Sequence, residues 1–233
     1  MAIQAKKQSP WLVILIIAAA VVLWALEQRP EPPADTAETR RPPETSTPPK
    51  PAPRPEARDR RGQYEIHRNG TLAADKNNDG DSFRVRLSDG REEIFRLYFV
   101  DTPESAFKSY RNGENNHDRI RDQADYFNIA PQRAVEIGQA GKHLTLGLLA
   151  EHPFTLYTKW DSPFRDQRYH AFIEVTENGR PRWLHELLVA KGLARLKTKP
   201  ADLPDGTAAA AHRKQLEARE RSAKATQAGA WQN

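Results

Sequence analysis

The chain has 233 residues, of which 38% are hydrophobic and 29% charged, which is enough for one sizeable folded core with appended segments. It contains no cysteine, so disulfides, thiolate catalysis and cysteine-based zinc sites are excluded. The 36 Lys and Arg residues exceed the 31 Asp and Glu residues, giving a formal charge of +5. This mild basic excess is compatible with a polyanionic partner but does not identify one.

An apolar segment follows the basic N-terminus. A pair of lysines precedes an uninterrupted apolar run from Trp11 to Leu26, with a tryptophan near each end. This pattern predicts a transmembrane signal-anchor helix over residues 11–26, with residues 1–10 in the cytoplasm and the rest of the chain in the periplasm or outside the cell. The alternative is a cleaved signal peptide and a secreted protein, for which Ala18 and Ala20 offer a small-x-small cleavage site.

A proline-rich segment, residues 27–61, comes next. Ten of the chain's 18 prolines lie between Pro30 and Pro55, and the segment has no large apolar residue. Such a composition cannot build a packed core, so we expect a disordered linker. The folded domain is therefore expected over residues 62–233.

Alternating apolar and polar residues mark the strands of this domain. The pattern runs from Phe83 to Leu87 and again from Phe95 to Phe99, which predicts two strands. Asp89-Gly90 lies between them and supplies the positive φ angles of a tight hairpin. Further strands are expected at 154–158 and 169–175.

Helical patterns follow later in the chain. Helices are expected behind Pro131, over 183–190 and over 207–228, because apolar residues recur there at helical spacing. Strands first and helices later predict an α+β fold, with a small antiparallel barrel and about three flanking helices.

Acidic residues stand at the ends of the two paired strands. Asp81 precedes the first strand and Asp101 follows its hairpin partner. Antiparallel pairing can bring such ends together, and the two carboxylates with the Thr102 carbonyl would offer calcium an incomplete shell of oxygen ligands. Water and a phosphate could complete that shell. The same residues are also compatible with a simple turn at Asp79-Gly80 and a helix cap at Asp101.

A different calcium motif is disfavoured by its spacing. The run from Asp75 to Gly80 matches the opening of an EF-hand loop. The twelfth position of that loop, where a bidentate Glu is required, is Arg86, and the sequence there alternates as a strand.

Six sequence blocks in a fixed order carry a family resemblance. They are Asp79–Phe83, Phe95–Leu97, Val100–Glu104, Tyr169–Ile173, Glu186–Ala194 and Gly229–Trp231. Together they resemble the staphylococcal thermonuclease family over about residues 64–231, and the ordered set is far more specific than any one block. The resemblance implies a five-stranded OB-fold barrel that acts as a monomer and hydrolyses phosphodiester bonds of DNA and RNA with calcium.

The resemblance also assigns catalytic roles. Arg96 matches the family's first catalytic arginine and Glu104 its catalytic glutamate. Arg168 is our choice for the second arginine, since it stands three positions before Ala171 in the matching strand. Arg165 is the alternative, because the Tyr-Gly pair that usually precedes this arginine is missing. Without the family pattern, Arg96 would be interpreted as a solvent-facing strand residue and Glu104 as a first-turn carboxylate.

These roles are chemically reasonable. A guanidinium group can bind two phosphate oxygens at once and keeps its charge at working pH. A glutamate can orient or deprotonate the attacking water. The main alternative is a non-catalytic nucleic-acid-binding OB-fold module. The segment 105–132 resembles the family poorly, and the seven histidines show no metal-binding spacing.

Overall fold

The computed structural model describes residues 59–111, 113–163 and 167–232. The expected N-terminal anchor and nearly all of the expected linker, residues 1–58, lie outside the described residues. No helix in the described ranges is both long enough and apolar enough to cross a bilayer.

The described part of the chain forms nine strands, four α-helices and one short 3₁₀ helix. The strands are β1 (Arg60–Arg61), β2 (Tyr64–Leu72), β3 (Ser82–Arg86), β4 (Glu92–Leu97), β5 (Val100–Asp101), β6 (Phe154–Thr158), β7 (Tyr169–Glu177), β8 (Arg180–Trp183) and β9 (Arg195–Leu196). The helices are α2 (His117–Phe127), α3 (Pro131–Glu151), α4 (Leu184–Ala190), α5 (Ala209–Ala225) and the 3₁₀ helix η1 (Gly229–Trp231).

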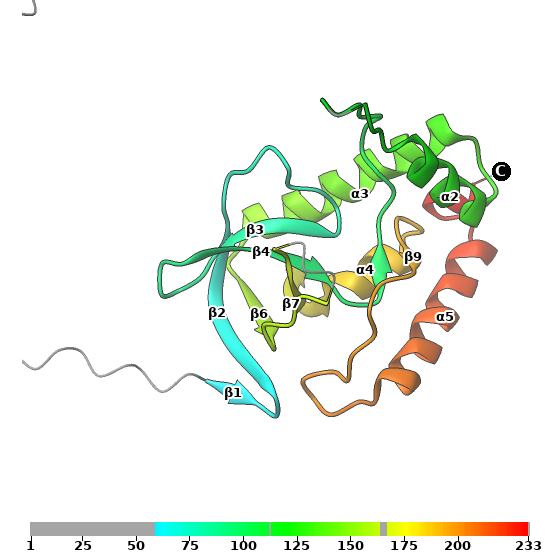
Figure 1. Ribbon diagram of the computed structural model, residues 1–233. Coiled ribbons are helices and arrows are strands. Elements are labelled where there is room, and N and C mark those ends of the chain that lie inside the picture. The colour runs from blue at the N-terminus through cyan, green and yellow to red at the C-terminus, as the bar shows by residue number, and fades with distance from the viewer. Residues whose placement is uncertain (1–58, 112, 164–166, 233) are drawn as a thin grey trace, which may run out of the picture. The chain divides into compact units, whose positions relative to one another are not determined.

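A closed five-stranded barrel lies at the centre of the domain (Figure 1). Its strands pair in the order β2-β3-β4-β7-β6, and β6 pairs with β2 to close the ring. The predicted α+β class with a small barrel is confirmed. The barrel is mixed rather than antiparallel, because β4 and β7 run parallel. Five strands cannot alternate in direction around a closed ring, so at least one neighbouring pair must be parallel.

The local elements follow the sequence patterns closely. β3 and β4 form the expected antiparallel hairpin, and Gly90 at its turn has φ +86°. Proline at position 131 opens α3, as expected. Four α-helices are described instead of about three, and the extra one is α2, in the segment that resembles the family poorly.

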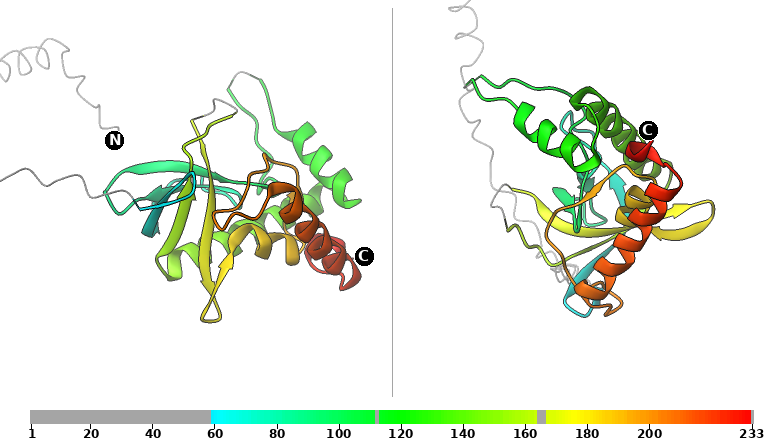
Figure 2. Two further views of the ribbon diagram at one scale, coloured as in Figure 1. Left: turned by 90° about the horizontal axis from the view of Figure 1, so that it is seen from below. Right: turned by 90° about the vertical axis from the view of Figure 1, so that its right-hand side faces the viewer.

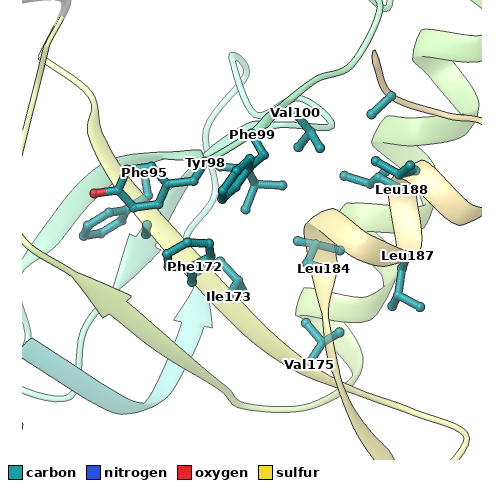
Figure 3. Packing of buried hydrophobic residues seen from close by; sticks show 14 of the residues in the cluster. Phe95, Tyr98, Phe99, Val100, Phe172, Ile173, Val175, Leu184, Leu187 and Leu188 are labelled. Atoms are coloured by element: carbon teal, nitrogen blue, oxygen red, sulfur yellow. The ribbon is translucent and has the colours of Figure 1, made fainter. Parts of the chain in front are cut away.

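Aromatic residues fill the barrel and pack against the helices. Phe95, Phe99 and Phe172 are fully buried, and the ring of Phe172 lies 4.8 Å from that of Tyr98. Figure 3 shows Phe99 and Phe172 between Phe95 and the α4 residue Leu184. Burial of one such side chain stabilises the fold by about 1.5–3 kcal/mol. Figure 2 shows α2 and α5 on the same side of the barrel strands.

The backbone after β5 is held tightly against α3. A Cβ atom at Gly138 would lie 2.5 Å from the carbonyl oxygens of both Pro103 and Glu104. A Cβ at Gly80 would lie 2.8 Å from the hydroxyl of Thr102. A side chain at Gly138 would push this backbone away, and one at Gly80 would displace the Thr102 side chain, so both glycines allow the close packing.

Candidate active site

A cleft of about 430 Å³ opens beside the start of β3 and the end of β4. Seven charged side chains of both signs line it: Asp79, Asp81, Arg96, Glu104, Lys108, Arg119 and Arg168. Four of these are site residues that the sequence suggested. We call this feature the candidate cleft.

Arg96 joins the two aspartates expected to bind metal. Its Nη2 donates hydrogen bonds to Asp81 Oδ2 at 3.2 Å and to Asp101 Oδ1 at 2.8 Å. All three side chains are buried, and the Arg96 Nε has no hydrogen-bond partner within the described ranges. The β3–β4 ladder creates this arrangement, because it pairs Arg96 with Ser82, next to Asp81. The structure therefore brings the three residues together.

Asp101 is surrounded by cationic groups. Its Oδ1 also accepts a hydrogen bond from Arg119 at 2.6 Å, and its Oδ2 accepts from Arg195 at 2.8 Å and from Gln123 at 3.1 Å. Burial opposes ionisation, but Arg119 and Arg195 outweigh it and hold the pKa of Asp101 below its ordinary value. Asp101 is therefore a carboxylate at neutral pH.

Asp81 behaves differently, although it shares the Arg96 guanidinium. Burial raises its pKa to about 6, and Arg96 offsets only part of that effect while the nearby charge of Asp101 adds to it. Asp79 also has a raised pKa, chiefly because of burial. A group of carboxylates with raised pKa values in a cleft is typical of a site that binds a cation or handles protons.

Glu104 is held by two residues of α2 and by Asn116, which caps the start of that helix. Its Oε1 accepts a hydrogen bond from Arg119 Nε at 2.7 Å, and its Oε2 accepts from Asn116 at 3.3 Å. Its backbone N–H donates to Gln123 Oε1 at 2.9 Å. Because Arg119 bonds both Glu104 and Asp101, one guanidinium fixes the positions of the expected base and the expected metal ligand.

The Thr102 carbonyl accepts a hydrogen bond from Gln123 Nε2 at 3.0 Å, the same nitrogen that bonds Asp101. Asp101 thus shares the Arg96 guanidinium with Asp81 and the Gln123 amide with Thr102. Carboxylate and carbonyl oxygens are the ligands that calcium prefers, so the donor set fits that ion. Arg96 and Arg119 donate hydrogen bonds to these carboxylates in the structure. The two guanidinium groups would have to shift for an ion to bind there.

The residues that the sequence interpretation missed lie mainly on one face of α2. Asn116, Arg119 and Gln123 are spaced i, i+3 and i+7, which places them on the same side of the helix. Arg195, on β9, was also missed. The polar spacing was visible in the sequence, but a polar helix face normally points to solvent, and nothing local indicates that this one faces a buried carboxylate.

No protein-family model matches this chain, and no curated protein matches it. Function is therefore inferred from the residues and their geometry.

The second arginine is the least defined of the expected site residues. Arg168 lines the candidate cleft and is half-buried. Its alternative, Arg165, lies outside the described residues. The structure thus places Arg168 with the other site residues, while Arg119 is a further guanidinium at the same cleft.

A separate histidine cluster lies between α4 and α5. His185, Glu186 and His212 are buried, and one possible ligand atom from each lies within 4.8 Å of the others. The two Nε2 atoms are 2.7 Å apart, which is a hydrogen-bond distance, and Arg219 bonds Glu186 at 2.8 Å. Burial lowers the pKa of both histidines, so the rings are neutral. We interpret this cluster as a hydrogen-bonded link between the helices.

Proposed function

We propose that the chain is a calcium-dependent nuclease of the thermonuclease type, with an OB-fold barrel, that hydrolyses phosphodiester bonds of DNA and RNA. The observation that carries the proposal is the convergence of Asp81, Arg96 and Glu104 at one cleft, with Asp101 buried beside it and hydrogen-bonded to Arg96. These residues come from three sequence blocks that follow one another within residues 79–104. Their order resembles that family, and their chemistry suits a phosphodiester.

The proposed mechanism gives each side chain a separate task. Asp81, Asp101 and the Thr102 carbonyl would hold the calcium ion, which would neutralise charge on the phosphate. Arg96 lies beside the same carboxylates and would bind a phosphate oxygen, so that the charge developing there meets a fixed cation. Glu104 would orient the attacking water and accept its proton.

Two more residues could contribute to substrate binding. Arg168 lines the cleft and would serve as the second phosphate-binding arginine. Tyr110 also lines the cleft and is 49% exposed, so its ring can stack on a nucleic-acid base.

We further propose that residues 11–26 anchor the protein in the cytoplasmic membrane as a single span, with the catalytic domain outside the cytoplasm. The support is the apolar run with its flanking lysines and tryptophans. Secretion after signal cleavage is the competing outcome, and the mass of the mature protein separates the two.

Cleavage of labelled oligonucleotides tests the proposed activity. The full-length chain should cut single-stranded DNA and RNA when calcium is present and stop when EGTA is added. Glu104→Gln should lower the rate about 10²–10⁴-fold, because the base is lost while shape is preserved. Glu136→Gln is the matched control, since Glu136 is exposed on α3 and pairs only with Arg133 in the described ranges.

Two outcomes would contradict the proposal. Inactivity of the wild-type chain on both DNA and RNA with calcium would reject nuclease activity. Binding of oligonucleotides without cleavage, unchanged by Glu104→Gln, would favour the non-catalytic nucleic-acid-binding module instead.

A further inference from the structure

Two more clefts continue from the candidate cleft along α3. The second is lined by Lys108, which also lines the candidate cleft, and by Lys76, Lys142 and Leu146. The third shares Lys76, Lys142 and Leu146 with the second and ends at Leu72. Shared lining residues make the three clefts neighbours, one after another. We call the second and third clefts the lysine groove.

Three lysines give this groove positive charge. Lys76, Lys108 and Lys142 form no ion pair with any carboxylate in the described part of the chain, and Lys76 and Lys108 are exposed. The one carboxylate that lines the third cleft, Asp75, is paired with Arg84 at 2.8 Å. The groove therefore presents unpaired cations.

The floor of the groove is apolar and open. Leu72 and Leu146 are half-buried hydrophobic residues that line it. Gly147 lines it too, and a Cβ atom there would meet nothing within 4 Å. Cations beside an apolar floor suit a chain that carries phosphates on one edge and flat bases on the other.

We propose that the lysine groove binds a single nucleic-acid strand as it leaves the candidate cleft, with phosphates on Lys108, Lys142 and Lys76 and bases against Leu72 and Leu146. A single strand fits because its bases are free to contact the floor, whereas a duplex hides them. This inference rests on the proposed function, since the bound strand is the substrate. It adds the path by which the strand leaves the candidate cleft and a minimum strand length for full affinity.

Binding as a function of strand length tests the inference. The probe is fluorescein-labelled oligo(dT) of about 3 or about 12 nucleotides, lengths that fall below and within ordinary single-strand site sizes. Fluorescence anisotropy with the full-length Glu104→Gln chain measures affinity without cleavage. Adding Lys76→Gln and Lys142→Gln should weaken the longer strand about 25-fold at about 0.1 M salt, and flatten the salt dependence by about 1.4 in log–log slope. The shorter strand should bind equally well.

A second variant tests the shape of the groove without changing its charge. Gly147→Leu puts a side chain into the groove without removing a cation, and leucine is a better helix former than glycine. It should also weaken the longer strand alone. Lys214→Gln is the matched control, because this exposed lysine lies on α5 and lines none of the three clefts.

The outcomes distinguish this inference from the proposed function. If the lysine and glycine variants bind the longer strand as well as the parent, the groove is not the path, even when the wild type cleaves DNA. If the longer strand depends on these residues but the wild type cleaves nothing, the groove stands as a binding site and the nuclease proposal falls.

Discussion

Two groups of buried polar side chains in this domain respond to acid in opposite ways. At the candidate cleft, burial raises the pKa of Asp81, so protonation there relieves a cost of folding. Between α4 and α5, burial lowers the pKa of His185 and His212, so protonation creates a cost. The helix link is built from neutral rings, whereas the candidate cleft retains at Asp81 a charge that stability alone does not favour. A loss of stability of this kind is common where a site binds a charged ligand.

The largest expected effect comes from Asp101. Asp101→Asn should destabilise the fold by about 3–5 kcal/mol, because it leaves the buried Arg195 and Arg96 short of a negative charge. Urea unfolding measures the change. Asp122→Asn is the control: Asp122 also pairs with Arg195, but its side chain is 55% exposed, and its loss should cost no more than about 1 kcal/mol. Equal losses of unfolding free energy in the two variants would show that the buried ion pairs of Asp101 contribute no more to stability than the exposed pair of Asp122.

Replacing the other aspartate should have the opposite sign. Asp81→Asn should stabilise the calcium-free protein by roughly 1–3 kcal/mol at pH 8. The folded-state pKa of about 6 lies above the ordinary 3.8, so wild-type stability rises as pH falls through that window and the advantage of the variant disappears near pH 4. Thermal melts in EGTA from pH 4 to 8 give the comparison. A variant that is less stable at pH 8 would contradict the raised pKa.

The histidine link should show the smallest effect at neutral pH. Gln215 Oε1 can only accept a hydrogen bond, so the His212 Nδ1 at 3.2 Å carries a proton, and its Nε2 accepts from His185. Replacing both rings, as His185→Phe with His212→Leu, removes donor and acceptor together and should cost less than about 1 kcal/mol at pH 8.

Lowering the pH should destabilise the wild type more than this double variant. Because the folded-state pKa values lie below 6.5, the stability contributed by neutral rings is present above pH 6.5 and is lost as pH falls. Between pH 7 and 5 the wild type should lose roughly 2 kcal/mol more than the double variant. Parallel pH profiles of the two proteins would show that these histidines are not buried neutral groups.

Local patterns in the sequence predicted local structure well. The Phe83–Leu87 alternation and the Asp89-Gly90 turn specify the hairpin through side-chain period and backbone φ, which neighbouring residues determine. The parallel β4–β7 pairing depends on how distant strands close the ring, and no short window carries that information.

At the candidate site, too, the contacts set by local strand pairing were predictable and those set by distant packing were not. Asp81, Arg96 and Asp101 lie on or beside paired strands, so the ladder that the alternation predicts also brings them together. Arg119 and Gln123 reach Asp101 only because α2 packs over the cleft. Helix spacing shows that they share a face but not what that face contacts.

The contact between Gly138 and the carbonyl oxygens of Pro103 and Glu104 has a consequence for tuning the site. One added methyl group at position 138 would shift Glu104 relative to the proposed calcium ligands, while every side chain of the candidate cleft kept its chemical identity. The position of Glu104 can thus be changed without changing its chemistry, and Gly138→Ala would measure how strongly the proposed cleavage depends on that position alone.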